Sequence, residues 1–431
     1  MKEEYKLSLT TVILINLNIM LGVGLFINTT ELAKRAGVLG AFSYATIGFL
    51  LFPLIFSFVQ LLQRYPTGGF YTFGTAVIHP FVGFLSTWSY FIGKLASTML
   101  IIHTFVLLIQ EAIPFISSLN PLMLDCIAVA GITILNLFNI KTGSAIQAWT
   151  MAFKLIPIML IIGVGLFLVN GANFIITKPV LPSIISTLPL VLFATIGFEA
   201  ACSLSNNIQD PQKNAPRAVL FSYAIIILLY CLYQLIFYGI LGTTLSQQLD
   251  YRGAFPAFLS FLLPHAVQLR AGLLVIINIA IAVSALGAAY GIFYSNMWNL
   301  YILAQHGHII ASNKLTLLNK QQVPFLCVIA QACICLLYLA ASYGSQLPLQ
   351  RVGTFGISIT YTISVLSLLL IRYRNQESLW LPLFGFINCL ILFIACINGL
   401  FETGIIALNV FVALFCLGIV MFWYTSRTKL A

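Results

Sequence analysis

Two ionisable residues, Lys94 in the segment FIGKLAS and Glu199 in ATIGFEA, lie inside long apolar stretches of the sequence. Each lies about ten residues into its stretch, which corresponds to about 15 Å of helix and to the middle of a bilayer. A charge at that depth is costly and usually faces a cavity, so we expect both side chains to face the protein interior. Lys154, about eight residues into another stretch, either reaches the membrane surface or has a function.

Glycines weaken two of these stretches at a similar depth. Gly22 and Gly24 interrupt the first stretch, and Gly197 precedes Glu199 in the sixth. Each glycine costs a helix about 1 kcal/mol relative to alanine. A break would expose unpaired amides, which suit a carboxylate, and unpaired carbonyls, which suit an ammonium. An amino acid carries both groups on one carbon, so the two breaks predict a site for an amino acid.

The composition of the sequence indicates that these residues lie in membrane-spanning helices. Of the 431 residues, 61% are hydrophobic and only 7% are charged, whereas a soluble protein carries about 25% charged residues. The apolar stretches are continuous over about 17 to 30 residues, which favours helices over the strands of a barrel. The net charge of +10 is scattered in ones and twos, so we expect no nucleic-acid partner. The five histidines show no metal-binding spacing, and we expect neither a metal nor a cofactor.

Twelve membrane spans are predicted. Their limits are Leu9–Ile27, Leu39–Leu62, Phe84–Ile109, Pro121–Phe138, Ile146–Val169, Leu188–Leu204, Val219–Leu241, Leu273–Leu303, Phe325–Ala341, Val352–Ile371, Leu381–Ile397 and Ile405–Tyr424. We predict a single transmembrane domain over residues 1–431. Spans one to five and spans six to ten form two successive units, and because five is an odd number the second unit starts on the opposite side of the membrane from the first. Residues 9–169 and 188–371 are therefore predicted to form an inverted repeat, followed by two extra helices over 381–424.

The distribution of basic residues predicts the orientation. With the N-terminus inside, thirteen of the twenty lysines and arginines fall in cytoplasmic segments and six on the opposite side. Positive charge favours the cytoplasmic side, so both termini are predicted to be cytoplasmic. We expect a multi-pass protein of the plasma (inner) membrane.

Four segments resemble a known family. The segment GVGLF at Gly22–Phe26 resembles the G-S-G-I-F motif of the amino acid–polyamine–organocation (APC) superfamily. Three further segments resemble that family in the same order: RYPTGGFY from Arg64, ATIGFEA with NNIQDPQKNAPRAV from Ala194, and NLYILAQHGHII from Asn299. The resemblance implies an all-α integral membrane protein with a LeuT-like 5+5 inverted repeat, about twelve transmembrane helices, and breaks in spans one and six.

The breaks and the resemblance together assign the candidate site. The expected substrate-binding residues are Gly22, Val23, Gly24, Phe193, Ala194, Gly197 and Lys94, and the residues expected to couple protons or to gate are Glu199 and Lys154. Amides of the first break should bind the substrate carboxylate, carbonyls near Ala194–Gly197 should bind its ammonium, and Phe193 should cover it. The resemblance implies that the Lys154 ammonium takes the place of a sodium ion. A charged Lys94 would repel cationic substrates.

The sequence therefore predicts a secondary active transporter of neutral or acidic amino acids, working by alternating access with proton coupling or exchange in a lipid bilayer. One alternative is an exchanger of cationic amino acids, amines or polyamines, which Glu199 favours and the two lysines oppose. Another is a membrane nutrient sensor that transports nothing. We expect no enzyme, since no catalytic set stands out. Among the other polar residues, Glu111 and Asp125 are expected to be solvated, and His103 to pack near the outer end of its span.

Overall fold

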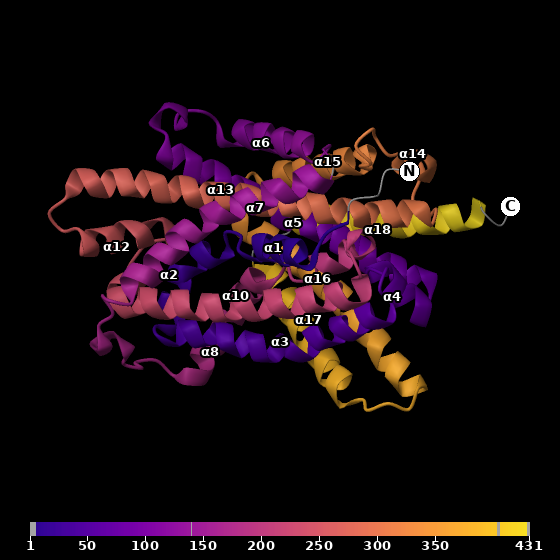
Figure 1. Cartoon of the computed structure of the whole chain (residues 1–431), viewed down its shortest axis with the longest axis horizontal. Helices are drawn as coiled ribbons and strands as arrows, with labels where there is room; N and C mark the ends of the chain where they lie inside the picture. Colours follow the sequence, from indigo (N-terminus) through magenta and orange to yellow (C-terminus); the bar gives the residue numbers. More distant parts are fainter. Residues whose placement is uncertain (1–5, 139, 403–405, 429–431) are drawn as a thin grey trace.

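The computed structural model describes residues 6–138, 140–402 and 406–428. It is a bundle of long helices that lie roughly along one axis (Figure 1). Its first and last described residues lie toward one end of the bundle, together with α14 (Ser312–Leu315), and we call this the terminal end. The loop before α13 (Val267–Gln305) lies at the opposite end.

The long helices agree with the predicted spans. Within the described residues, nine helical segments are long and apolar enough to cross a membrane, a bent pair forms a tenth, and two further apolar helices are shorter. In chain order the spans are α1 (Leu9–Met20) with α2 (Gly24–Ala36), α3 (Leu39–Arg64), α5 (Pro80–Ala112), α6 (Pro121–Leu135), α7 (Ile140–Met159) with a π-helical turn (Leu160–Val164), α8 (Val180–Thr195) with α9 (Ala200–Ser203), α10 (Pro211–Leu241), α13, α15 (Phe325–Ser342), α16 (Gln346–Arg374), α17 (Trp380–Glu402) and α18 (Ile406–Thr428). The predicted start of the last span, Ile405, lies outside the described residues.

Short helices connect the spans. They are α4 (Phe70–Val77), α11 (Thr243–Ser246), α12 (Ala254–Leu262), α14 and the 3-10 turns Pro114–Ile116, Gly171–Phe174, Ser205–Asn207 and Tyr251–Gly253. Proline starts several spans, because its missing amide needs no partner in the first turn. At Pro121, for example, the preceding Asn120 caps α6 by accepting a hydrogen bond from the Leu122 amide at 2.8 Å.

The first span is broken and longer than predicted. The axes of α1 and α2 differ by 46° across the break, and α2 continues to Ala36, so the predicted limit at Ile27 was wrong. The polar residues that directly follow Ile27, which are Asn28, Thr29 and Thr30, are buried against other helices. Asn28 Nδ2 donates to the Leu190 carbonyl at 2.7 Å, and the Thr29 carbonyl accepts from Gln234 at 3.1 Å. Hydropathy alone cannot find a helix whose polar side chains are paired inside the protein.

The sixth span is broken at Gly197. Helix α8 ends at Thr195 and α9 begins at Ala200, with Gly197 between them at φ +138°. The span begins at Val180, earlier than the predicted Leu188. The amide of Leu7, ahead of span one, donates to the Asn207 carbonyl at 2.8 Å, so the chain entering span one is tied to the chain leaving span six.

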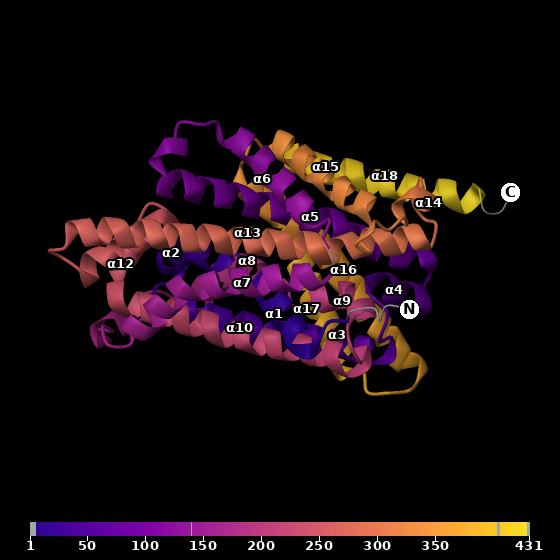
Figure 2. The ribbon, with the colours of Figure 1, turned by 45° about the horizontal axis from the view of Figure 1, so that its top comes forward.

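Helix α5 lies at the centre of the bundle. In its most apolar window 83% of the residues are buried, more than in the other eight described helical segments that are long and apolar enough to cross a membrane. It packs most extensively against α13 and α16, and α13 lies beside it in both ribbon views (Figures 1 and 2). Gly93 of α5 lies so close to α16 that an added Cβ would be 2.9 Å from Gly356 Cα. This central position brings Lys94 of α5 to the two broken spans.

Candidate functional site

A cavity lies between the two broken spans. Six of the predicted substrate-binding residues line it: Gly22, Val23, Gly24, Phe193, Ala194 and Lys94. Its other lining residues are Ile19, Met20, Ser97, Ile101, Ile196 and Ile292. Gly197, Glu199 and Lys154 do not line the cavity, and they act on it through the contacts described below.

The first break leaves helix ends with unpaired groups. The Gly22 amide donates to the Met20 carbonyl at 2.7 Å and is therefore already taken. Helix α2 begins at Gly24, and the amides of a first helical turn have no acceptor within their own helix. The partial positive charge of a helix N-terminus adds to their attraction for an anion. The amides available at this break are therefore that of Val23, which precedes α2, and those that start at Gly24.

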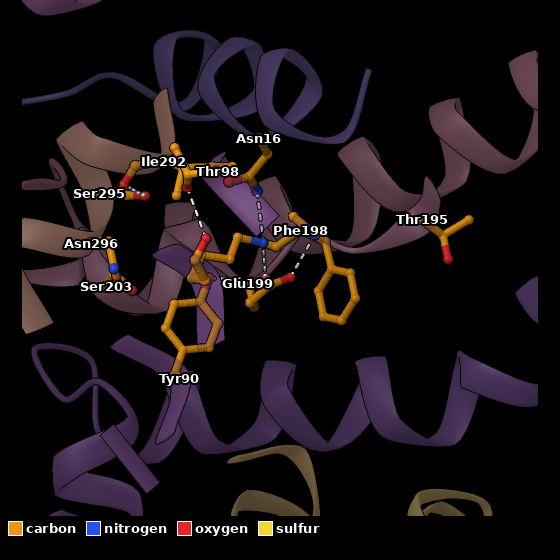
Figure 3. A network of polar contacts seen from close by, with 12 residues as sticks. Asn16, Tyr90, Thr98, Thr195, Phe198, Glu199, Ser203, Ile292, Ser295 and Asn296 are labelled. Carbon is orange, nitrogen blue, oxygen red and sulfur yellow. Dashed lines mark hydrogen bonds and ion pairs between the residues drawn. The ribbon is translucent and has the colours of Figure 1, made fainter. Parts of the chain in front are cut away.

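The two breaks contact one another directly, and glycine permits this contact. A Cβ on Gly24 would lie 2.9 Å from Ala194 Cα, which is too close for two carbon atoms. A Cβ on Gly197 would lie 2.8 Å from the Met20 side chain, and its φ of +138° is rare for any other residue. Asn16 Nδ2 also donates to the Phe198 carbonyl at 3.0 Å, which holds α1 against the sixth span (Figure 3).

Glu199 joins α5 to the break in the sixth span. Its Oε1 accepts hydrogen bonds from Lys94 Nζ and Tyr90 Oη, both at 2.9 Å, and its Oε2 accepts from the Gly197 amide at 2.7 Å. Figure 3 shows Tyr90 and Glu199 turned toward one another. The Lys94 and Glu199 side chains are 4% and 0% exposed. Buried charges persist when they are paired and hydrogen-bonded, and both conditions hold here.

This ion pair changes the expected effect of Lys94 on the substrate. The ammonium at the cavity wall has a carboxylate at 2.9 Å, so the pair as a whole presents no net charge to the cavity. The repulsion expected between Lys94 and a cationic substrate is correspondingly weaker. Attraction for an acidic substrate is weaker for the same reason, because that substrate would compete with Glu199.

Lys154 lies inside the protein, and the alternative that it reaches the membrane surface is wrong. Its side chain is fully buried, and its Nζ donates to the Asn18 carbonyl and, at 2.8 Å, to the Leu21 carbonyl. Ser284 of α13 donates to the same Leu21 carbonyl at 3.2 Å. The last carbonyls of a helix lack internal donors and attract a cation. Lys154 supplies that cation at the end of α1.

Sequence reasoning missed some groups and misjudged others. Tyr90 lies one helical turn before Lys94, a spacing that places both on one face of α5 and could have indicated a shared partner. Asp125 was expected to be solvated, but it is fully buried and contacts His103 Nδ1 at 2.7 Å. The two residues lie on α5 and α6, and only the packing of these helices brings them together. Glu111 is partly exposed and pairs with Arg252 at 3.0 Å.

The family model described as amino acid permease matches residues 7–423, nearly the whole chain. The chain belongs to the amino acid permease family. The helical architecture of this permease fits the LeuT-like membrane fold of the APC superfamily. The permease is an integral membrane protein, and its family is one of transporters of small-molecule amino acid substrates.

Several relatives of the permease are named for their substrates. It is 24% identical to a D-serine/D-alanine/glycine transporter of Escherichia coli O6:H1, over 83% of this chain and 78% of the relative. It is 25% identical to the low-affinity putrescine importer PlaP of Escherichia coli K12, over 79% of this chain and 75% of the relative. It is 23% identical to the lysine-specific permease LysP of Lactococcus lactis, over 75% of this chain and 67% of the relative. These names include both neutral and cationic substrates.

Proposed function

We propose that the permease carries neutral amino acids by alternating access, in symport with a proton or in exchange for a second amino acid. The observation that carries this proposal is the cavity between the two breaks, where two helix ends of opposite polarity meet. The amides that begin α2 at Gly24 bind the substrate carboxylate, and the last carbonyls of α8, which ends at Thr195, bind its ammonium. Phe193 covers the bound molecule.

The walls of the cavity favour a neutral side chain. Most of the side chains that line it are apolar, including Ile101, Ile196 and Ile292. The lining has one charged group, Lys94, which is paired with Glu199. A second charge on the substrate would be desolvated there without a free partner, which is costly. Carriers of lysine and putrescine among the relatives make cationic substrates the principal rival class.

Lys154 couples the substrate site to protons in this proposal. As an ammonium it binds the carbonyls of Asn18 and Leu21 at the end of α1. When it releases a proton it loses its charge, and these charge-assisted hydrogen bonds weaken. Helix α1 is then freer to move relative to α7, which opens the cavity toward the terminal end. We place that end in the cytoplasm of a plasma-membrane protein, and we assign residues 9–169 and 188–371 to the two halves of an inverted repeat.

Competition for counterflow in proteoliposomes tests the substrate class. Liposomes loaded with unlabelled alanine or leucine take up the labelled amino acid, and competitors are added outside. We expect neutral amino acids to inhibit at concentrations at least about tenfold lower than arginine, glutamate or putrescine, a difference of about 1.4 kcal/mol in binding. Stronger inhibition by arginine or putrescine would make the cationic exchanger the better account. Binding of amino acids without any uptake would instead indicate a sensor.

A further inference from the structure

A line of polar side chains, all buried except the half-buried Thr150, leads away from Lys154 between α1, α7 and α13. It consists of Asn18, Thr150, Gln147 and Tyr290, which we call the polar seam. Asn18 Nδ2 donates to Gln147 Oε1 and, at 3.1 Å, to Thr150 Oγ1. The backbone carbonyl of the same asparagine accepts from Lys154. Asn18 therefore joins the lysine to the seam.

The seam follows one face of α7. Lys154, Thr150, Gln147 and Gly143 are spaced by four, three and four residues, which places them in one stripe along a helix. The distance from Lys154 to Gly143 along this stripe is about 16 Å. Helix α7 begins at Ile140, so the stripe leads toward the start of the helix.

Glycines bring α13 against this stripe, with the two helices antiparallel. A Cβ added to Gly287 would lie 2.5 Å from the Thr150 side chain, and a Cβ added to Gly291 would lie 2.7 Å from Gln147 Nε2. On α7, a Cβ at Gly143 would lie 2.9 Å from Tyr290 Oη. The Tyr290 hydroxyl therefore lies about one turn beyond Gln147, nearer to the terminal end, because α13 runs toward α14 at that end.

Several polar atoms of the seam are buried without a partner. Asn18 Oδ1, Gln147 Nε2 and Tyr290 Oη have no hydrogen bond to any described residue. Unpartnered buried polar atoms are costly, and most such groups in proteins bind ordered water. In the other direction from Lys154 lie Ile158 of α7 and Ile161 of the π-helical turn that follows it, both fully buried. Polar groups thus line one side of the lysine and apolar groups the other.

We propose that the polar seam conducts protons between Lys154 and the terminal end of the bundle, through water bound by its unpartnered atoms. The Lys154 ammonium transfers a proton to the first water and becomes a neutral amine, and hydrogen-bonded water passes the excess proton along the seam. At each water one O–H bond forms and another breaks, and the last water releases the proton at the terminal end. The groups that face Lys154 are the Asn18 and Leu21 carbonyls of α1 and Ser284 of α13. The titratable group of the seam itself is Tyr290. This proposal rests on the coupling role proposed for Lys154.

Two variants test the seam, each measured in two assays. Tyr290→Phe removes one oxygen from the seam, and Gln147→Leu removes its central amide. Substrate-driven proton uptake is followed with a pH-sensitive dye inside proteoliposomes, and counterflow of labelled substrate is measured in the same preparation. We expect each variant to slow proton uptake by at least about fivefold, the effect of about 1 kcal/mol on a barrier, and to change counterflow by less than about twofold, because exchange needs no net proton transfer.

A matched control and a coupling control separate the outcomes. Tyr338→Phe removes an equally buried hydroxyl without a described partner on α15, outside the seam, and should leave both rates unchanged. If both seam variants take up protons at the parental rate, the proposed proton pathway is wrong. If Gln147→Leu does not fold, the rate of Tyr290→Phe alone decides whether the pathway is kept. If Lys154→Ala keeps its proton uptake, the coupling role of Lys154 is wrong as well. Loss in Lys154→Ala with parental rates in the seam variants rejects the seam alone.

Discussion

Replacing Glu199 with glutamine should destabilise the permease markedly. The substitution keeps the size of the side chain and an oxygen that can accept from the Gly197 amide. It removes the charge that faces Lys94 Nζ at 2.9 Å, and the lysine side chain is only 4% exposed. Removing one partner of a buried ion pair costs about 3–5 kcal/mol, because the remaining charge is buried without compensation. We therefore expect a loss of that size in the free energy of unfolding.

A double-mutant cycle isolates this interaction. Lys94→Met should be destabilising as well, whereas the double variant should recover most of the lost stability, because uncharged side chains of similar volume often replace a buried pair at little cost. Melting temperatures in detergent, compared at one scan rate, provide the measurement. Glu111→Gln is the matched control, since its partner Arg252 is 47% exposed and an exposed pair contributes about 0–1 kcal/mol. The reasoning is refuted if Glu199→Gln melts like Glu111→Gln, or if the double variant is no more stable than the single ones.

Three further predictions concern the breaks and the coupling lysine. Gly24→Ala should reduce counterflow by at least about tenfold, because its Cβ would lie 2.9 Å from Ala194 Cα and overpacking costs about 1–3 kcal/mol. Gly131→Ala is the control, because Gly131 has open space around it. Equal counterflow rates in the two variants would contradict the close contact. Gly197→Ala should lower the melting temperature through both strain and overpacking, and an unchanged value would show that the break can relax. Lys154→Ala should lose accumulation driven by a proton gradient but retain counterflow, and a strict requirement for sodium in the parent protein would contradict the role of the ammonium.

The membrane spans and their breaks could be predicted largely from the properties of short sequence segments. The apolar stretches are long and nearly free of charge, so the spans could be found one at a time. Gly24 and Gly197 marked the breaks because a glycine weakens a helix in any context. The depth of Glu199 predicted that it faces the interior, and it is fully buried. Each of these inferences needs only a short segment and the cost of moving it into lipid.

Pairings between distant residues could not be predicted in this way. Lys94 and Glu199 lie 105 residues apart, and their contact depends on how α5 packs against the broken sixth span. Without that contact, Lys94 was expected to act on the substrate as a free charge. Asp125 was misjudged for a similar reason, because its partner His103 lies on a neighbouring helix. For a buried charge, the partner determines the role, and the partner is set by tertiary packing.

The most direct test of a substrate site between the breaks is an experimental structure with the strongest competitor from the counterflow panel bound. We predict that its carboxylate lies within about 3.2 Å of the amides that begin α2 at Gly24. Its ammonium should face the carbonyls at the end of α8 near Thr195. A molecule bound instead in the second cavity, which Leu192, Thr354 and Cys389 line between α8, α16 and α17, would contradict the proposed site.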